Sequence, residues 1–504
     1  MYQAAQLVGS NPFKALDHSF KNIDTFLDRG NFRPIGRAIE NLERALVFDF
    51  GEATGLPPHA VNGAFRIILI ALLAIVSCNV VSALLRSAGA VSAKHLPTVV
   101  LYPMVLAGVL VAGDHYSPMT SYMFVLTGSV IVILATGLCV ARDRDMSARR
   151  LAWHEVVVMI GLGAVLATTY DLLYLAPPFS GAYVAARAAA SGSTSKLLRL
   201  ASLRRWLLLS VGFLTAFVPV RIEIFRRCRL STCYSATDPD LTVDALGRTA
   251  DRLVTGLPPA GWRYSADLLD RAGARTGHVA LARNALLAIL LVAVVFIAFT
   301  TARHLIRRAS AREMAEVDWK RSAAALGALG VVTALMPSLL AGLSKRTQSV
   351  RPAIGEAWRE TLLVQVGWSL VAAALLTVTF GLVGRSQFAR VVVILAAGLL
   401  CGSMALTLLA NARVTRADRI TPLHAITSEM ATAAIHFDPT PAGNVRRCGL
   451  VDSFTAIRPG TKNWVSGPNV GAELDGLMLD IHNARFCEPT NLRGGAVSPP
   501  EDAP

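Results

Sequence analysis

The fold is decided by long apolar stretches, and the clearest of them, residues 65–85, reads FRIILIALLAIVSCNVVSALL. A helix needs about 20 residues to cross the hydrocarbon core of a membrane, and this stretch is long enough to do so. Comparable stretches recur along the chain at roughly 97–113, 119–141, 151–169, 172–190, 206–222, 281–302, 323–344, 361–384 and 390–411. Their number predicts an all-α polytopic membrane protein with about ten transmembrane helices.

The composition of the whole chain supports this class. Of its 504 residues, 53% are hydrophobic and only 16% are charged, and the mean hydropathy is +0.48. A soluble globular protein is less apolar than this, so the excess must face lipid. The net charge of +15 can indicate a nucleic-acid partner, but most Lys and Arg residues lie in short loops beside apolar stretches. We therefore interpret the charge as a sign of topology and expect no nucleic-acid partner.

Three basic segments predict the orientation of the helices. Residues 142–150, 196–205 and 303–322 are rich in Arg and Lys, and we expect all three to face the cytoplasm. They share one side only if residues 151–190 cross the membrane twice, with Asp171 at the tip between two short spans. One long helix over 151–190 is the alternative, and it changes the number of spans by one.

This topology divides the chain into five parts. Residues 1–62 form an amphipathic extracytoplasmic segment, residues 63–222 a first transmembrane bundle and residues 223–280 an extracytoplasmic loop. Residues 281–411 form a second transmembrane bundle, and residues 412–504 a small extracytoplasmic domain with a disordered tail. Residues 1–60 are charged and contain no signal peptide. Because such a segment is exported more readily behind a preceding span, we expect a transmembrane helix upstream of Met1. Export by the first downstream helix is the alternative.

Four cysteines lie in the two predicted outer parts. An oxidising compartment lets disulfides persist, so we expect Cys228 to pair with Cys233 and Cys448 with Cys487. Zinc is the alternative for the first pair, but the spacing lacks a second Cys or His pair to complete four ligands. The sequence therefore predicts no metal site.

Two short motifs near the N-terminus carry a resemblance to a known family. Residues 28–37 read DRGNFRPIGR, and residues 55–62 read GLPPHAVN and lead into an apolar helix. Together they resemble the first outer loop of GT-C-type polytopic membrane glycosyltransferases. In that superfamily a transmembrane helix precedes this loop, which agrees with the expected upstream helix. The resemblance implies sugar transfer from a polyprenyl-phosphate donor on the outer face, with an acidic residue of this loop as the base.

Asp17 and Asp24 are the candidate catalytic residues. Transfer of a sugar to a hydroxyl needs a carboxylate within hydrogen-bond reach to accept the proton. Their spacing of seven places both on one face of a helix. The alternative is that both are solvated charges on an amphipathic surface helix.

A basic loop after the apolar stretch 323–344 is the candidate site for the donor phosphate. Similar loops, in which a Pro is followed by Lys or Arg and then Gln, occur in GT-C glycosyltransferases. The topology places this loop outside, where the positive-inside rule disfavours Lys and Arg, so a phosphate-binding role accounts for them. Contact with anionic lipid headgroups is the alternative. The candidate residues are Lys345, Arg346, Gln348 and Arg351.

Several functions are excluded by the absence of their motifs. The sequence has no Walker A loop, no Rossmann glycine fingerprint and no HExxH motif, so we expect no nucleotide or metal cofactor. We therefore expect a GT-C-like glycosyltransferase of a bacterial plasma membrane, whose partners are membrane lipids, a polyprenyl-phosphate sugar donor and a cell-envelope glycan acceptor. A non-catalytic scaffold or degenerate homologue, or a transporter of lipids or solutes, are the alternatives.

Overall fold

The computed structural model is mainly helical in the part of the chain that it describes. Among those residues there is no β-strand, only an isolated antiparallel β-bridge between Pro239 and Ser344. The described residues run from 12 to 488, except for residues 22, 29, 57, 88–95, 114–116, 120–121, 143–152, 192–195, 230–232, 234–238, 272–292, 294–318, 384–387, 420–421, 458–477 and 479–481.

The chain forms two compact units, which we describe separately. The terminal unit comprises residues 1–18, 41–62 and 421–504, and the bundle unit comprises residues 19–40 and 63–420. In the terminal unit, α18 (Pro422–Ile435) and α19 (Pro441–Ile457) pack around a small buried core. Its members are Met430, Ala434, Leu450, Phe454, Met478 and Phe486.

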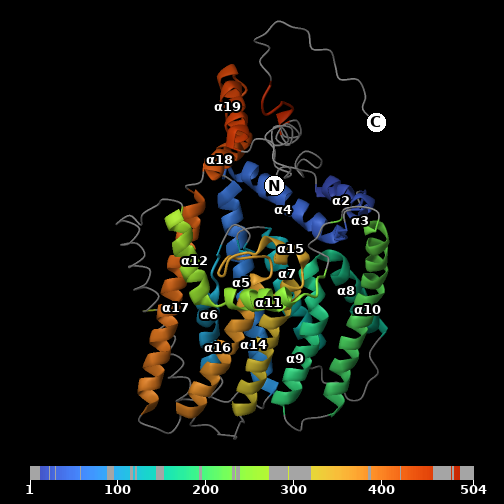
Figure 1. Cartoon of the computed structure of the whole chain (residues 1–504), viewed down its shortest axis with the longest axis vertical. Helices are drawn as coiled ribbons and strands as arrows, with labels where there is room; N and C mark the ends of the chain where they lie inside the picture. Colours follow the sequence, from blue (N-terminus) through green and yellow to red (C-terminus); the bar gives the residue numbers. More distant parts are fainter. Residues whose placement is uncertain are drawn as a thin grey trace. The chain divides into compact units, whose positions relative to one another are not determined.

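The bundle unit is built from long helices that run side by side, with shorter helices across one end (Figure 1). Three helices of the described chain have residues in both units, α2 (Pro12–Lys21), α4 (Pro34–Thr54) and α5 (Pro58–Ser87). The remaining helices are α3 (Ile23–Asp28), α6 (Leu96–Val109), α7 (Met123–Val140), α8 (Trp153–Thr169), η1 (Asp171–Leu175), α9 (Ala176–Ala190), α10 (Lys196–Cys228), α11 (Val243–Thr255), α12 (Pro258–Arg271), α14 (Trp319–Gly342), α15 (Lys345–Val350), α16 (Thr361–Val383) and α17 (Phe388–Arg419).

Within the described ranges, six helices are long and apolar enough to cross a membrane. Two shorter apolar helices, Thr98–Val109 and Trp153–Thr169, accompany them. The predicted count of about ten spans stays a prediction, because the stretch 281–302 lies outside the described residues except at Ala293. The six candidate spans are Ala60–Ser87, Met123–Val140, Ala201–Cys228, Trp319–Gly342, Thr361–Leu382 and Leu395–Ala417.

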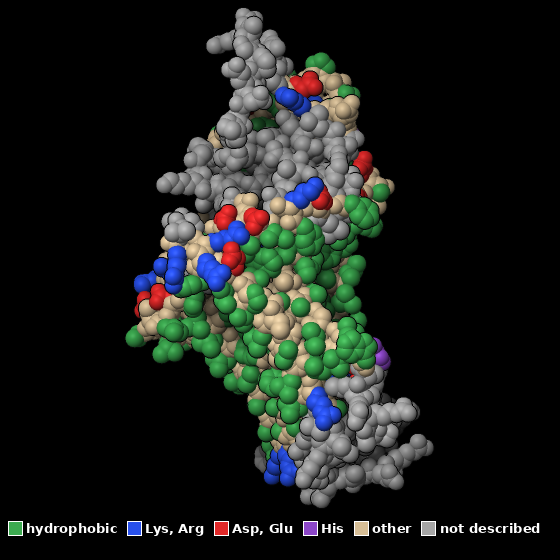
Figure 2. Space-filling model, turned by 90° about the vertical axis from the view of Figure 1, so that its right-hand side faces the viewer, with side chains coloured by type: hydrophobic (Ala, Val, Ile, Leu, Met, Phe, Trp, Pro, Cys, Tyr) green, Lys and Arg blue, Asp and Glu red, His purple; other side chains and the backbone are tan. Residues whose placement is uncertain are grey.

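Large hydrophobic side chains on the outside of these spans identify the surface that faces lipid. The exposed fractions are 72% for Ile67 on α5, 64% for Leu382 on α16 and 76% for Leu399 on α17. Figure 2 shows hydrophobic side chains as a broad band over the face in view, with charged side chains beyond it. Exposed apolar area of this extent is unfavourable in water. The chain is therefore a helical, multi-pass membrane protein.

The apolar run 151–190 is divided in two, as predicted. Helix α8 ends at Thr169, the short helix η1 begins at Asp171, and α9 then returns to the starting end of α8. Two arginines mark that end. Arg205 lies 3.9 Å from the carboxylate of Glu155 at the start of α8, and Arg187 near the end of α9 donates a hydrogen bond to the carbonyl of Ala141.

Contacts between the remaining helices define the two ends of the bundle. We call the end that holds Arg187 and Arg205 the Arg205 end. The start of α6 and the finish of α16 also lie there, and the hydroxyls of Thr98 and Thr377 are hydrogen-bonded at 3.1 Å. The opposite end, here called the Arg252 end, holds the finish of α6 and the start of α16. There the side chain of Gln365 donates to the carbonyl of Val111 at 2.9 Å.

Both predicted disulfides are confirmed. Cys228 is bonded to Cys233 in the bundle unit, and Cys448 is bonded to Cys487 in the terminal unit. The first bridge packs on Gly30, where an added Cβ would lie 3.0 Å from the Cβ of Cys233. Gly30 has a φ of +72°, a left-handed conformation that glycine adopts without strain. This contact holds the N-terminal segment against the finish of α10.

The predicted domain boundary at residue 412 falls inside a helix. α17 continues without interruption to Arg419, and the terminal unit begins again at residue 421. The last turns of α17 carry Arg413, Arg416 and Arg419, which end the apolar stretch without breaking the helix. A change to polar composition therefore marks the end of the apolar surface and not the end of the helix.

Candidate functional site

Helix α11 lies across the Arg252 end of the bundle (Figure 1). Its polarity is the reverse of that of a surface helix in a soluble protein. Its buried residues Ala245, Thr249, Arg252 and Thr255 recur at helical spacing on one face. Its outer face instead carries apolar side chains, with exposed fractions of 87% for Val243 and 70% for Leu246. A helix with apolar side chains outward and an arginine inward is suited to the interface between a membrane and water.

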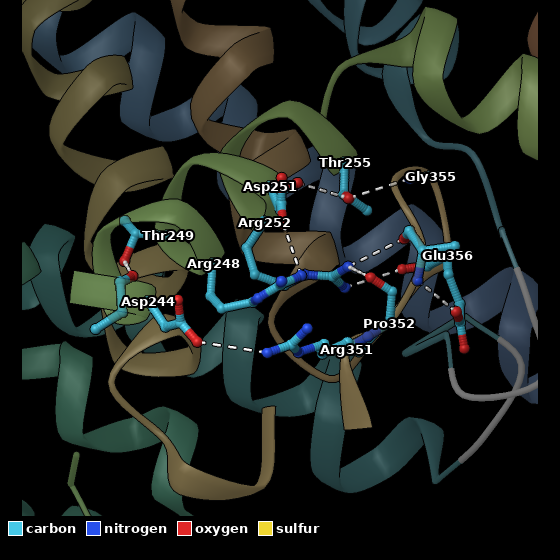
Figure 3. Close-up of polar contacts among 12 residues, drawn as sticks. Asp244, Arg248, Thr249, Asp251, Arg252, Thr255, Arg351, Pro352, Gly355 and Glu356 are labelled. Atoms are coloured by element: carbon cyan, nitrogen blue, oxygen red, sulfur yellow. Dashed lines mark hydrogen bonds and ion pairs between the residues drawn. The ribbon is translucent and has the colours of Figure 1, made fainter. Parts of the chain in front are cut away.

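Arg252 is the centre of a polar network beneath α11 (Figure 3). Its side chain is 1% exposed. The guanidinium donates hydrogen bonds to the carbonyls of Pro352 and Ala353, both at 3.0 Å, and to the carbonyl of Glu356 at 3.1 Å. One side chain thus satisfies three carbonyls of the same loop, residues 351–360. Such convergence fixes the path of the loop from α15 to α16.

Glu360 supplies the negative charge of this network. One of its carboxylate oxygens lies 3.9 Å from Arg252, and its side chain is 7% exposed. Burial raises the pKa of the Glu360 carboxyl, while the charges of Arg252 and Arg359 act in the opposite direction. The backbone carbonyl of Glu360 accepts hydrogen bonds from the amides of Leu363 and Val364 in the first turn of α16. Glu360 therefore joins the buried network to the start of a transmembrane helix.

The loop 351–360 has further support from α11 and from within itself. The amide of Gly355 donates to the hydroxyl of Thr255 at 3.1 Å, and the amide of Ala353 donates to the carboxylate of Glu356 at 2.8 Å (Figure 3). Gly355 has a φ of +90°, and an added Cβ would lie 2.3 Å from the carbonyl of Ala260. Only glycine fits at this position. The loop is thus a rigid structure that presents its outer residues in fixed positions.

The four predicted phosphate-binding residues lie on or directly after α15, beside this loop. Lys345 is exposed and Arg346 is half-buried. Gln348 binds its neighbours instead of facing outward. Its amide nitrogen donates to the carbonyls of Asp240 at 2.8 Å and Gly342 at 3.1 Å, and its oxygen accepts from Thr242 at 2.9 Å. The contacts of Gln348 show a structural role, and its binding of phosphate stays a prediction.

Arg351 is exposed and held by an ion pair. Its guanidinium lies 3.5 Å from the carboxylate of Asp244 on α11, and both side chains are more than 60% exposed (Figure 3). Its φ of +51° is left-handed, a conformation in which arginine is uncommon. An exposed pair at this distance contributes little to stability, so an incoming anion can compete with Asp244 for Arg351. Lys345, Arg346 and Arg351 together form what we call the basic edge.

Apolar side chains surround the basic edge. The exposed fractions are 85% for Leu241, 54% for Val350 and 52% for Ile354. Leu241 lies just before α11, Val350 is the last residue of α15, and Ile354 lies in the loop 351–360. Cationic and apolar groups therefore occupy one surface at the Arg252 end, a combination that suits a ligand with a phosphate head and a hydrocarbon tail.

Asp24, a predicted catalytic residue, lies in a cluster of exposed acids on α3 and α10. Arg227 binds three carboxylates in this cluster, those of Glu223 at 2.8 Å, Asp28 at 2.9 Å and Asp24 at 3.2 Å. The carboxylate of Asp24 is 83% exposed and accessible to a substrate.

Asp17, the other predicted catalytic residue, is exposed on α2 and belongs to the terminal unit. The basic edge belongs to the bundle unit. Catalysis by Asp17 or by Asp24 stays a prediction. Among the residues that the structure describes, no group of three or more His, Cys, Asp or Glu side chains is arranged to hold a metal ion.

Two buried arginines at the Arg252 end were not among the site residues predicted from the sequence. Arg252 follows Ala245 and Thr249 at helical spacing, and this run of small residues could have marked a packed face. Arg33 precedes Pro34 at the start of α4, and no local pattern distinguishes it from an exposed arginine. Its burial depends on contacts with residues far along the chain.

No known protein family, no curated protein and no solved structure matches the chain.

Proposed function

We propose that this protein is a GT-C-like membrane glycosyltransferase that transfers a sugar from a polyprenyl-phosphate donor to a cell-envelope glycan on the outer face. The basic edge, with Leu241, Val350 and Ile354 around it, carries this proposal. A polyprenyl phosphate has the matching chemistry, since its phosphate binds Lys and Arg while its tail lies among apolar side chains.

We also propose that the Arg252 end faces outward. The Cys228–Cys233 bridge lies at this end, and disulfides persist in extracytoplasmic compartments. The Arg205 end carries Arg142, Arg187 and Arg205, and at the start of α14 also Lys320 and Arg321, a pattern that the positive-inside rule assigns to the cytoplasm. Two independent features thus favour the same orientation.

In this proposal a carboxylate of the N-terminal segment is the general base. Asp24 or Asp17 accepts the proton of the acceptor hydroxyl as its oxygen attacks the anomeric carbon of the donor sugar. The C–O bond to the phosphate breaks, and polyprenyl phosphate leaves with the bonding electron pair. The basic edge stabilises the charge on the departing phosphate.

Substitution of the candidate bases tests this proposal. If Asp24 is the base, Asp24→Asn lowers the rate of sugar transfer by about a hundredfold to ten-thousandfold, because proton acceptance is lost. Asp28→Asn is the matched control, since Asp28 is also exposed and also binds Arg227. Transfer is measured with polyprenyl-phosphate sugars of several kinds and an envelope glycan acceptor.

The pattern across variants separates the possible outcomes. A loss confined to Asp17→Asn assigns the base to Asp17, and a loss confined to Asp24→Asn assigns it to Asp24. Full activity in both variants shows that neither carboxylate is the base. A folded wild-type protein that transfers none of the sugars supports a non-catalytic scaffold or degenerate homologue, and uptake of solute or lipid into vesicles supports a transporter.

A further inference from the structure

Arg33 is a buried cation without the hydrogen bonds that burial normally requires. It is 6% exposed, and its Nε and Nη1 atoms are buried with no hydrogen-bond partner among the described residues. A buried polar group that lacks a partner is costly, and a charged one more so. Arg252, at the same end of the bundle, shows the usual arrangement with three carbonyl partners. Arg33 thus differs from a structural arginine in its open donors.

The position of Arg33 is fixed by the tight packing of α4 on α8. An added Cβ at Gly36, in the first turn of α4, would lie 2.0 Å from the carbonyl oxygen of Thr169. The guanidinium carbon of Arg33 lies 5.0 Å from the centre of the Tyr170 ring, and Tyr170 is itself 4% exposed. A cation over an aromatic ring is stabilised without use of its N–H donors. The ring therefore holds the guanidinium in place without bonding to its Nε and Nη1 donors.

Charged groups of both signs lie around Arg33. Arg359, from the loop that Arg252 fixes, is close enough to act on Arg33 as a like charge. Glu40 and Asp171 are the opposite charges nearby, but Glu40 is paired with Arg37 at 2.8 Å. The amide groups at the start of α4 add partial positive charge at the same place.

Arg33 keeps its charge in this environment. Burial and the charge of Arg359 lower the pKa of Arg33, but Tyr170, Asp171 and Glu40 outweigh them, so the pKa is raised above its ordinary value. A permanently charged guanidinium presents its donors as a planar fork that matches a phosphate.

From these contacts we propose that Arg33, Arg359 and the start of α4 form a binding site for a phosphate group. The ligand is a phosphate monoester or inorganic phosphate, since these carry the charge that two arginines can balance. The proposal is independent of sugar transfer and of the basic edge. The same chemistry can come from a phosphate in solution or from a lipid headgroup, and the experiment separates the two.

The test uses the full-length protein in nanodiscs of phosphatidylcholine, with binding of radiolabelled inorganic phosphate and thermal unfolding as readouts. We expect phosphate to bind wild type and raise its unfolding temperature. Arg33→Gln is expected to weaken binding by at least about tenfold, because charged hydrogen bonds are lost. Arg226→Gln is the matched control, since Arg226 is an exposed arginine in the last turn of α10, at the Arg252 end of the bundle. It is expected to bind phosphate as wild type does.

The stability of Arg33→Gln without phosphate separates a ligand-binding role from a structural one. We expect this variant to be as stable as wild type or more so, because it removes a buried charge with open donors. The proposal is overturned if Arg33→Gln binds phosphate as wild type does. If that variant is also less stable than wild type, the role of Arg33 is structural. A second set of nanodiscs containing phosphatidic acid identifies the source. Protection by the lipid and not by inorganic phosphate assigns the site to a headgroup, and protection by both assigns it to phosphate in general.

Discussion

Replacement of Arg252 by methionine is expected to lower the free energy of unfolding by about 3–5 kcal/mol, the usual cost of removing one partner from a buried ion pair. The change leaves the Glu360 carboxylate buried without its cation, which lies 3.9 Å away in wild type. It also leaves the carbonyls of Pro352, Ala353 and Glu356 without the donor that they share. The loop 351–360 then loses the contacts that hold it under α11.

Arg248→Met is the matched control for this prediction. Arg248 lies one turn earlier on α11, is partly exposed and pairs with Asp251 at 2.9 Å, an arrangement that contributes less than about 1 kcal/mol. Unfolding of both variants by sodium dodecyl sulfate in mild detergent, followed by tryptophan fluorescence, gives the comparison. The double variant Arg252→Met with Glu360→Gln should recover part of the loss, since it removes the unpaired charge. If Arg252→Met is no less stable than Arg248→Met, the buried network does not stabilise the fold.

Gly163→Ala is expected to destabilise the protein by about 3 kcal/mol, at the upper end of the usual cost of overpacking a closed interface. An added Cβ at Gly163 on α8 would lie 2.1 Å from the carbonyl oxygen of Leu209 on α10. From the other side, a Cβ at Gly212 would lie 2.1 Å from the carbonyl oxygen of Ile160. These neighbours are backbone atoms, so the two helices must move apart to accommodate a methyl group. Small residues at such crossings are typical of helix pairs in membranes.

The matched control is Gly161→Ala on the same helix. An added Cβ at Gly161 meets nothing within 4 Å, and alanine has the higher helix propensity. This variant should keep or slightly increase the stability, measured by the same unfolding assay. Equal stability of Gly161→Ala and Gly163→Ala would show that α8 and α10 are not in backbone contact.

Features set by apolar length were predictable from the sequence. The stretch 65–85 lies within α5, and the run 151–190 turns at Asp171 as predicted. The first result follows from the length of the apolar stretch, and the second from the cost of placing the charge of Asp171 in hydrocarbon. The two disulfides were also predictable, because the topology predicted from the sequence assigned these four cysteines to outer segments and left the other three in apolar stretches.

The details of the polar surface depend on contacts that no local pattern records. The acid cluster around Arg227 exists because Gly30 and the Cys228–Cys233 bridge hold α3 against α10. Arg252 is buried because α11 turns its apolar face outward, the reverse of the order that water imposes on a soluble protein. Gln348 looked like an exposed polar residue, but the path of residues 239–242 brings the carbonyl of Asp240 and the hydroxyl of Thr242 to it.

Binding of polyprenyl phosphate to the purified protein tests the proposed function most directly. Native mass spectrometry compares this lipid with the neutral polyprenol of the same chain length, so the two ligands differ only in the phosphate. We predict that wild type binds polyprenyl phosphate at least about tenfold more tightly than polyprenol. The preference should shrink when Lys345, Arg346 and Arg351 are all replaced by alanine. Equal binding of the two lipids by folded wild type, or binding of neither, would contradict the account.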